Sequence, residues 1–153
     1  MDVIGAIRFN YLFRGLSKEQ IERVAEIVEQ RKLDGGEIMV RQFDRDTDLM
    51  IIVTGGAKIK SFSGETLAEV GPGSVIGEVS LVDDQPRSAT VVAVGTTVVA
   101  VIPGKKLGDL VNEDVALKAQ LVLNIGKVLC QRLRTANVQL DAALAKESSA
   151  QLL

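Results

Sequence analysis

Residues 71–90, GPGSVIGEVSLVDDQPRSAT, carry the side chains of this chain best suited to binding a small anion. They include one glutamate inside an apolar run, Glu78, and one arginine nine residues later, Arg87. The planar guanidinium of an arginine matches two phosphate oxygens at once, whereas a carboxylate beside a phosphate is repelled. Glu78 is explained if the ligand also offers hydroxyl donors, as the 2′-hydroxyl of a ribose does. The pattern predicts a site for a nucleotide with a single compact phosphate.

The backbone of the same segment favours this interpretation. Gly77 permits a close approach where a short helix begins, and the first amides of a helix have no internal partner. The amides around Gly77 and Ser80, with the amide and hydroxyl of Ser88, are expected to help Arg87 bind phosphate. The alternative is that Glu78 and Arg87 pair with each other as a surface ion pair, worth only about 0–1 kcal/mol.

The composition excludes several classes of function. Histidine is absent, which removes Ser-His-Asp chemistry and most zinc sites, so we expect no enzyme and no metal. A net charge of −2 and the lack of runs that alternate basic and aromatic residues argue against nucleic-acid binding by this chain alone. Cys130 is the only cysteine, which excludes an internal disulfide, and we expect it to be buried.

The chain has no sequence feature of secretion or membrane insertion. Its N-terminus lacks the apolar core of a signal peptide. The longest apolar stretch, ATVVAVGTTVVAVI, has 14 residues and is too short to span a bilayer. We expect a cytoplasmic protein with no membrane insertion.

Helical and strand patterns divide the chain into three parts. A helix is predicted over about 18–30, because Ser17 and Gln20 have the spacing of a capping box. Short strands follow from about 38 to 102, with predicted hairpins at Gly55-Gly56 and Gly95 and a turn at Ser63-Gly64. Many short strands indicate a sandwich, a barrel or a jelly roll.

After Pro103 the pattern is helical, and a long helix is predicted over about 114–146. It carries one apolar stripe, which consists of Leu117, Leu121, Ile125, Leu129, Leu133, Ala136, Leu140 and Leu144. The helix would be roughly 45–50 Å long at 1.5 Å per residue, more than a small β domain can cover. Its distal half is therefore expected to pair with another copy of the chain, or with an effector domain or protein.

Two short motifs resemble the phosphate-binding cassette of cyclic-nucleotide-binding domains, a family that includes catabolite activator proteins, protein kinase A regulatory subunits and cyclic-nucleotide-gated channels. They are Gly77-Glu78-Val79-Ser80-Leu81 and Pro86-Arg87-Ser88-Ala89-Thr90-Val91. The segments LFRGLSKEQIERVAEIVEQRKLDGGEIMV and IIVTGGAKIK and the long last helix are also similar to the family. The resemblance implies a mainly β fold, a β-roll (jelly-roll or double-stranded β-helix) flanked by N-terminal helices and a long C-terminal helix.

A single domain over 1–153 is expected, divided into a helical segment at 1–32, the β-roll at 33–102 and C-terminal helices at 103–147. The resemblance implies that Glu78 accepts a hydrogen bond from the ribose 2′-hydroxyl. It also implies that Arg87 binds the cyclic phosphate together with Gly77, Ser80 and Ser88. The residues implied to line the pocket or contact the base are Ile59, Leu67, Val75, Val79, Thr135 and Asn137.

One loop departs from the family pattern. Where the family often has Gly-Asp-x-Gly-Asp, this chain has residues 43–47, FDRDT, so we expect a different turn, away from the phosphate. A serine after the cassette arginine, Ser88 here, is similar to the pattern of the bacterial transcription factors that use cAMP. This favours cAMP over cGMP as the ligand. No cofactor is expected.

The expected function is that of a regulatory sensor that binds a cyclic nucleotide and signals by rearrangement of its C-terminal helix. One alternative is a cAMP-responsive transcription regulator, whose helix-turn-helix domain is missing from this chain. Another is a non-binding interaction scaffold with the same fold, although intact Glu78 and Arg87 argue against it. A metal-dependent jelly-roll enzyme is disfavoured by the lack of histidine.

Overall fold

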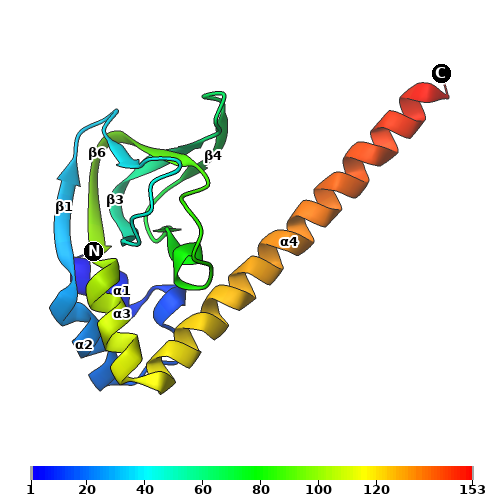
Figure 1. Cartoon of the computed structure of the whole chain (residues 1–153). Coiled ribbons are helices and arrows are strands. Elements are labelled where there is room, and N and C mark those ends of the chain that lie inside the picture. Colours follow the sequence, from blue (N-terminus) through cyan, green and yellow to red (C-terminus); the bar gives the residue numbers. More distant parts are fainter. Residues whose placement is uncertain (1, 153) are drawn as a thin grey trace.

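Two long antiparallel strands, β3 (Leu49–Lys60) and β6 (Thr90–Ile102), form the centre of the fold in the computed structural model, which describes residues 2–152 (Figure 1). The shorter strands are β1 (Glu29–Leu33), β2 (Ile38–Val40), β4 (Thr66–Val70) and β5 (Val75–Ile76). β1 and β2 pair with β6, and β4 and β5 pair with β3, all antiparallel. The expected β-roll with helices at both ends is confirmed.

Helices precede and follow the roll. They are α1 (Val3–Arg8), α2 (Lys18–Ile27), α3 (Gly104–Glu113) and α4 (Val115–Gln151), with the 3-10 turns η1 (Tyr11–Phe13) and η2 (Glu78–Leu81). The capping box at the start of α2 is confirmed, since the Ser17 side chain accepts from the Gln20 amide and the Gln20 side chain accepts from the Ser17 amide. α2 ends at Ile27 rather than near 30, and the first strand begins at Glu29, earlier than expected. Its polar, mostly exposed residues gave no alternating pattern that would have indicated a strand.

Both faces of the central strands are buried, which explains their nearly continuous apolar sequence. Along β3, Leu49 and Ile51 pack into a core shared with the helices, whereas Met50 and Ile52 face the interior of the roll. The helical core also contains Phe13, the largest of the fully buried side chains. One hydrophobic core therefore joins the helices to the roll, and a second core fills the interior of the roll, on the other side of the strands.

The predicted hairpins at Gly55-Gly56 and at Gly95 are wrong, because β3 and β6 each continue through their glycines as one strand. The glycines instead mark a bend where the two strands shift register against each other. Gly55 has a φ of 86°, and a Cβ there would lie 2.5 Å from the Thr96 carbonyl oxygen. The buried Thr97 hydroxyl bridges the bend by donating to the Gly56 carbonyl at 3.0 Å. The turn predicted at Ser63-Gly64 is confirmed and joins β3 to β4.

The long C-terminal helix is confirmed and has two different halves. Leu117, Leu121 and Ile125 are buried against the rest of the domain. Beyond them α4 leaves the domain and projects into solvent (Figure 1), where Leu140 is 57% exposed. Cys130 lies on this outgoing part and is exposed, so its expected burial is wrong. Within the described residues, no helix is both long enough and apolar enough to cross a bilayer.

Candidate functional site

A cavity of about 780 Å³ opens between the interior of the β-roll, η2 and the outgoing part of α4. This volume lies in the range typical of small-molecule sites. The cavity is lined by eight of the residues that the sequence singled out, namely Ile59, Val75, Gly77, Glu78, Val79, Ser80, Arg87 and Ser88. In residues 2–152, no cluster of three or more acidic or cysteine side chains is arranged to hold a metal ion.

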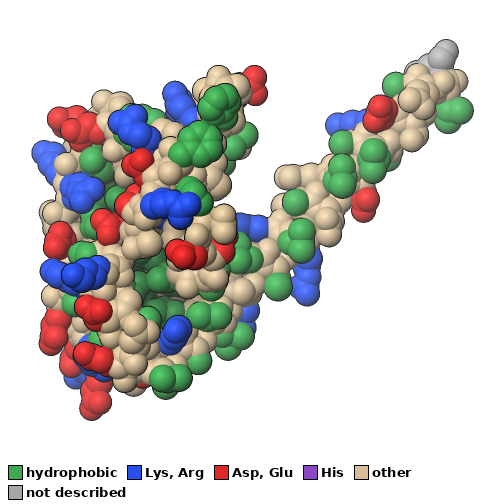
Figure 2. All heavy atoms as spheres, viewed as in Figure 1, with side chains coloured by type: hydrophobic (Ala, Val, Ile, Leu, Met, Phe, Trp, Pro, Cys, Tyr) green, Lys and Arg blue, Asp and Glu red, His purple; other side chains and the backbone are tan. Residues whose placement is uncertain are grey.

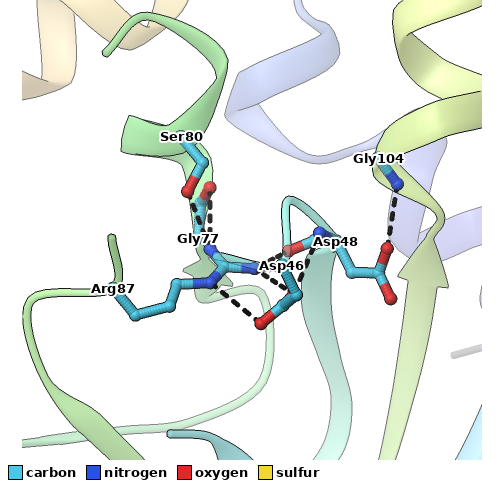
Figure 3. A network of polar contacts seen from close by, with 6 residues as sticks. All are labelled: Asp46, Asp48, Gly77, Ser80, Arg87 and Gly104. Atoms are coloured by element: carbon cyan, nitrogen blue, oxygen red, sulfur yellow. Dashed lines mark hydrogen bonds and ion pairs between the residues drawn. The ribbon is translucent and has the colours of Figure 1, made fainter. Parts of the chain in front are cut away.

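Arg87 is buried at the wall of this cavity, and hydrogen bonds engage all five of its N–H donors (Figure 3). Its Nη2 donates to Asp46 Oδ1 at 2.7 Å and to the Asp48 carbonyl, and its Nε donates to Asp46 Oδ2 at 3.3 Å. Its Nη1 donates to Ser80 Oγ at 3.0 Å and to the Gly77 carbonyl at 3.3 Å. The guanidinium is thus fixed in orientation, with one edge on the β2–β3 loop and the other on η2.

The loop at 43–47 is closer to the site than the sequence suggested. Within it, Phe43 adopts a left-handed conformation with a φ of 72°. The expectation that this loop lies away from the phosphate-binding arginine is wrong, because Asp46 forms the bidentate ion pair with Arg87. Partial burial alone would raise the pKa of Asp46, but the hydrogen bond and the positive charge of Arg87 outweigh it and lower that pKa.

Glu78 is also buried, and its partner comes from α4. Its Oε1 accepts a hydrogen bond from Arg132 Nη1 at 2.6 Å, and the Glu78 side chain is only 4% exposed. The alternative of a surface ion pair between Glu78 and Arg87 is wrong, since each is buried and paired with a different residue. The ion pair joins the cassette directly to the C-terminal helix.

We expect the Arg132→Gln substitution to lower the free energy of unfolding by about 1–2 kcal/mol, because it leaves the buried Glu78 carboxylate without its cation. The loss is smaller than for a fully buried ion pair, because the Arg132 side chain is half-exposed. Urea unfolding followed by circular dichroism measures it. Arg134→Gln is the matched control, because Arg134 is exposed on the same helix with no ion pair within residues 2–152. Equal stability of the two variants would show that the Glu78–Arg132 pair contributes nothing.

Three predicted pocket residues do not reach the cavity. Leu67 is 64% exposed, because the alternation of side chains along β4 turns Ala68 and Val70 inward instead. Thr135 and Asn137 are exposed on the part of α4 that projects away from the roll. The helix reaches the cavity one turn earlier, at Arg132.

Sequence reasoning missed three residues of the site. Arg132 lies two helical turns after the buried Ile125, on the same face of α4, and this register could have identified it. Asp46 lies in the loop that departs from the family pattern, and Tyr11 lies far from the cassette in the sequence. No signal in the sequence places either of the last two beside Glu78 and Arg87.

Together, the β-roll, the glycine-rich cassette with its buried arginine and glutamate, and the helix that reaches the cavity define a domain built around a small-ligand site. The family model described as "Cyclic nucleotide-binding domain" matches residues 30–114. The chain therefore belongs to the cyclic nucleotide-binding domain family.

Individual proteins show the same similarity. The chain is 32% identical over 145 residues to the cyclic AMP receptor protein of Thermus thermophilus, covering 90% of this chain and 63% of that protein. It is 36% identical over 88 residues to the cAMP-dependent protein kinase regulatory subunit of Yarrowia lipolytica, covering 58% of this chain and 23% of that one. The chain thus spans less than two thirds of either relative. The crystal structure of a cyclic nucleotide-binding domain from Methylobacillus flagellatus superposes with a TM-score of 0.75 at 25% identity, covering 90% of this chain and 79% of that one.

Proposed function

We propose that this domain binds a 3′,5′-cyclic nucleotide, cAMP rather than cGMP, and acts as a regulatory sensor with no catalytic activity of its own. The observation that carries the proposal is the placement of a buried arginine and a buried glutamate, Arg87 and Glu78, on the wall of one cavity. In the free domain Arg87 is paired with Asp46 and Glu78 with Arg132. A phosphate beside a ribose hydroxyl would give the guanidinium an anion and the carboxylate a hydroxyl donor, both as charge-assisted hydrogen bonds. Ser88 and the relatives named for cAMP support the choice of base.

Phosphate binding would require Arg87 to exchange a partner, because its five donors are already engaged. The Nη1 edge is the one to exchange, since it bonds to the neutral Ser80 hydroxyl and the Gly77 carbonyl, whereas the other edge holds the Asp46 carboxylate. A phosphate oxygen would replace the Ser80 oxygen on Nη1. The freed hydroxyl would then donate its own proton to the phosphate.

Two connections would carry the change to the C-terminal helices. Arg87 donates to the carbonyl of Asp48, and the carboxylate of Asp48 accepts from the Gly104 amide at the start of α3 at 2.9 Å (Figure 3). The second is the hydrogen bond from Arg132 on α4 to Glu78. A ligand that binds one arrangement of these contacts more tightly would shift the population of α4 positions.

Isothermal titration of the purified protein, stripped of copurified nucleotide, with 3′,5′-cAMP and then cGMP tests the proposal. We expect micromolar or tighter binding of cAMP and weaker binding of cGMP. Absence of heat and of a thermal shift with both nucleotides would overturn the proposal and favour a scaffold that keeps the fold without a ligand.

We also propose that the projecting half of α4 pairs with the same segment of a second copy. Leu133, Leu140 and Leu144 form one stripe on this half, and each is more than half exposed. Figure 2 shows hydrophobic side chains along the projecting helix. A lone helix in water is only marginally stable, and pairing two such stripes removes them from solvent.

Leu140→Glu is expected to weaken the dimer about a hundredfold or more, because two leucines would leave an apolar seam and two carboxylates would enter it. Sedimentation equilibrium measures the dissociation constant. Val138→Glu is the control, since Val138 is also exposed but lies on nearly the opposite face of the helix. A wild-type protein that stays monomeric at 100 µM or above, roughly the concentration at which weak pairs assemble, would contradict the proposal.

A further inference from the structure

Tyr11 carries a hydroxyl group that the structure leaves without a partner. Its oxygen is the one buried side-chain polar atom in residues 2–152 that has no hydrogen bond. A buried polar group without a partner is costly, and such groups are rare in native proteins. Tyr11 is among the residues that line the cavity of Arg87 and Glu78, and the charges of Glu78 and Arg132 act on its hydroxyl, so this buried hydroxyl lies at the wall of the site.

The charged neighbours of this hydroxyl are the members of the Glu78–Arg132 pair. The pKa of Tyr11 is raised to about 12, mainly by burial and further by the negative charge of Glu78, against the opposing positive charge of Arg132. The hydroxyl is therefore fully protonated at neutral pH and remains a hydrogen-bond donor. Glu78 is bonded to Arg132 through Oε1, and no hydrogen bond joins it to Tyr11.

The backbone around Tyr11 is fixed from two sides. Asn10 caps η1 by accepting from the Leu12 amide at 3.0 Å, and its Nδ2 donates to the Gly73 carbonyl on the cavity rim at 2.9 Å. From α4, the buried Asn124 donates to the carbonyls of Leu12 and Arg14 at 2.7 and 2.8 Å. The backbone that carries Tyr11 is thus fixed before any ligand arrives, which limits the entropy lost on binding.

We propose that the Tyr11 hydroxyl is a ligand-binding group that donates a hydrogen bond to the ribose 2′-oxygen of the bound nucleotide. The inference rests on the proposed function and extends it. A 2′-hydroxyl has one proton to donate and lone pairs to accept, so it needs an acceptor and a donor on the protein. Glu78 supplies only the acceptor. Tyr11 supplies the donor, and its unpaired state in the free protein is the state that a ligand hydroxyl relieves.

The test compares wild type with Tyr11→Phe, which removes only the hydroxyl, by calorimetry with cAMP and 2′-deoxy-cAMP. We expect the dissociation constant for cAMP to rise about tenfold, the value for one hydrogen bond of ordinary strength. The dissociation constant for 2′-deoxy-cAMP should change less than twofold. The melting temperature of the free variant should equal or exceed that of wild type, because a buried unpaired hydroxyl has been removed.

A second readout uses the composition of the chain, which has a single tyrosine. Tyrosine labelled with carbon-13 at Cζ gives one NMR resonance, whose shift reports hydrogen bonding of this hydroxyl. The resonance should move with cAMP and much less with 2′-deoxy-cAMP.

The outcomes separate the two proposals. If wild type binds cAMP and Tyr11→Phe binds it equally well, the role of Tyr11 is wrong and the proposed function stands. Equal losses for cAMP and the 2′-deoxy analogue would also overturn the 2′-oxygen contact and indicate a packing role. If wild type binds no cyclic nucleotide, both proposals fail.

Discussion

Replacing Arg87 with alanine is expected to weaken cyclic-nucleotide binding by about 30- to 1000-fold, equivalent to about 2–4 kcal/mol. The guanidinium is buried and held on its far edge by Asp46, so its position in the free protein is already close to the one a phosphate requires. The interaction takes place away from bulk water, where a charge-assisted hydrogen bond is strong. Calorimetry with cAMP measures the loss.

Arg45→Ala is the matched control, because Arg45 is an exposed arginine in the loop that carries Asp46. Thermal unfolding of both variants is needed, since Arg87 also accounts for five hydrogen bonds within the protein. Arg87→Lys keeps the charge but not the planar fork, and we expect it to recover only part of the affinity. A folded Arg87→Ala protein that binds cAMP within twofold of wild type would exclude Arg87 as the phosphate ligand.

Glu78→Gln is expected to weaken cAMP by about 10- to 100-fold, because a hydrogen bond to a charged acceptor is worth about 1.5–3 kcal/mol. The loss should be specific to the 2′-hydroxyl. Binding of 2′-deoxy-cAMP, measured in the same titrations, should change by less than about threefold, because that ligand lacks the hydroxyl that Glu78 would contact and the two changes are then not coupled through it.

The control for Glu78→Gln is Glu69→Gln, which removes a carboxylate from an exposed ion pair with Lys58 on the roll. That change should leave both affinities unaltered, since exposed pairs contribute little. Equal losses for cAMP and its 2′-deoxy analogue in Glu78→Gln would show that the carboxylate organises the cassette, through Arg132, without contacting the ribose.

Local sequence patterns predicted much of the secondary structure. The capping box of Ser17 and Gln20 starts a helix because both of its hydrogen bonds are made within three residues. The apolar stripe beginning at Leu117 predicted the long final helix, because the spacing of its residues follows the period of a helix and needs no contact with other segments. The glycines misled because a positive φ serves a tight turn and a bent strand equally well. Only the pairing of β3 with β6 decided that Gly55 and Gly95 belong to a bend.

For the site as well, some features follow from the sequence and others only from the tertiary structure. By itself, the sequence determined that one arginine and one glutamate stand nine residues apart in a glycine-rich cassette, because that information is carried by residue types and short spacing. The tertiary structure alone decided that Asp46 and Tyr11 lie beside them, since these residues come from a loop and the N-terminal segment. Helical register indicates the face of α4 on which Arg132 lies, but only the packing of α4 brings that face to Glu78. Contacts between such distant segments depend on how the hydrophobic core that the helices share with the strands packs them against the roll, and no local spacing encodes that packing.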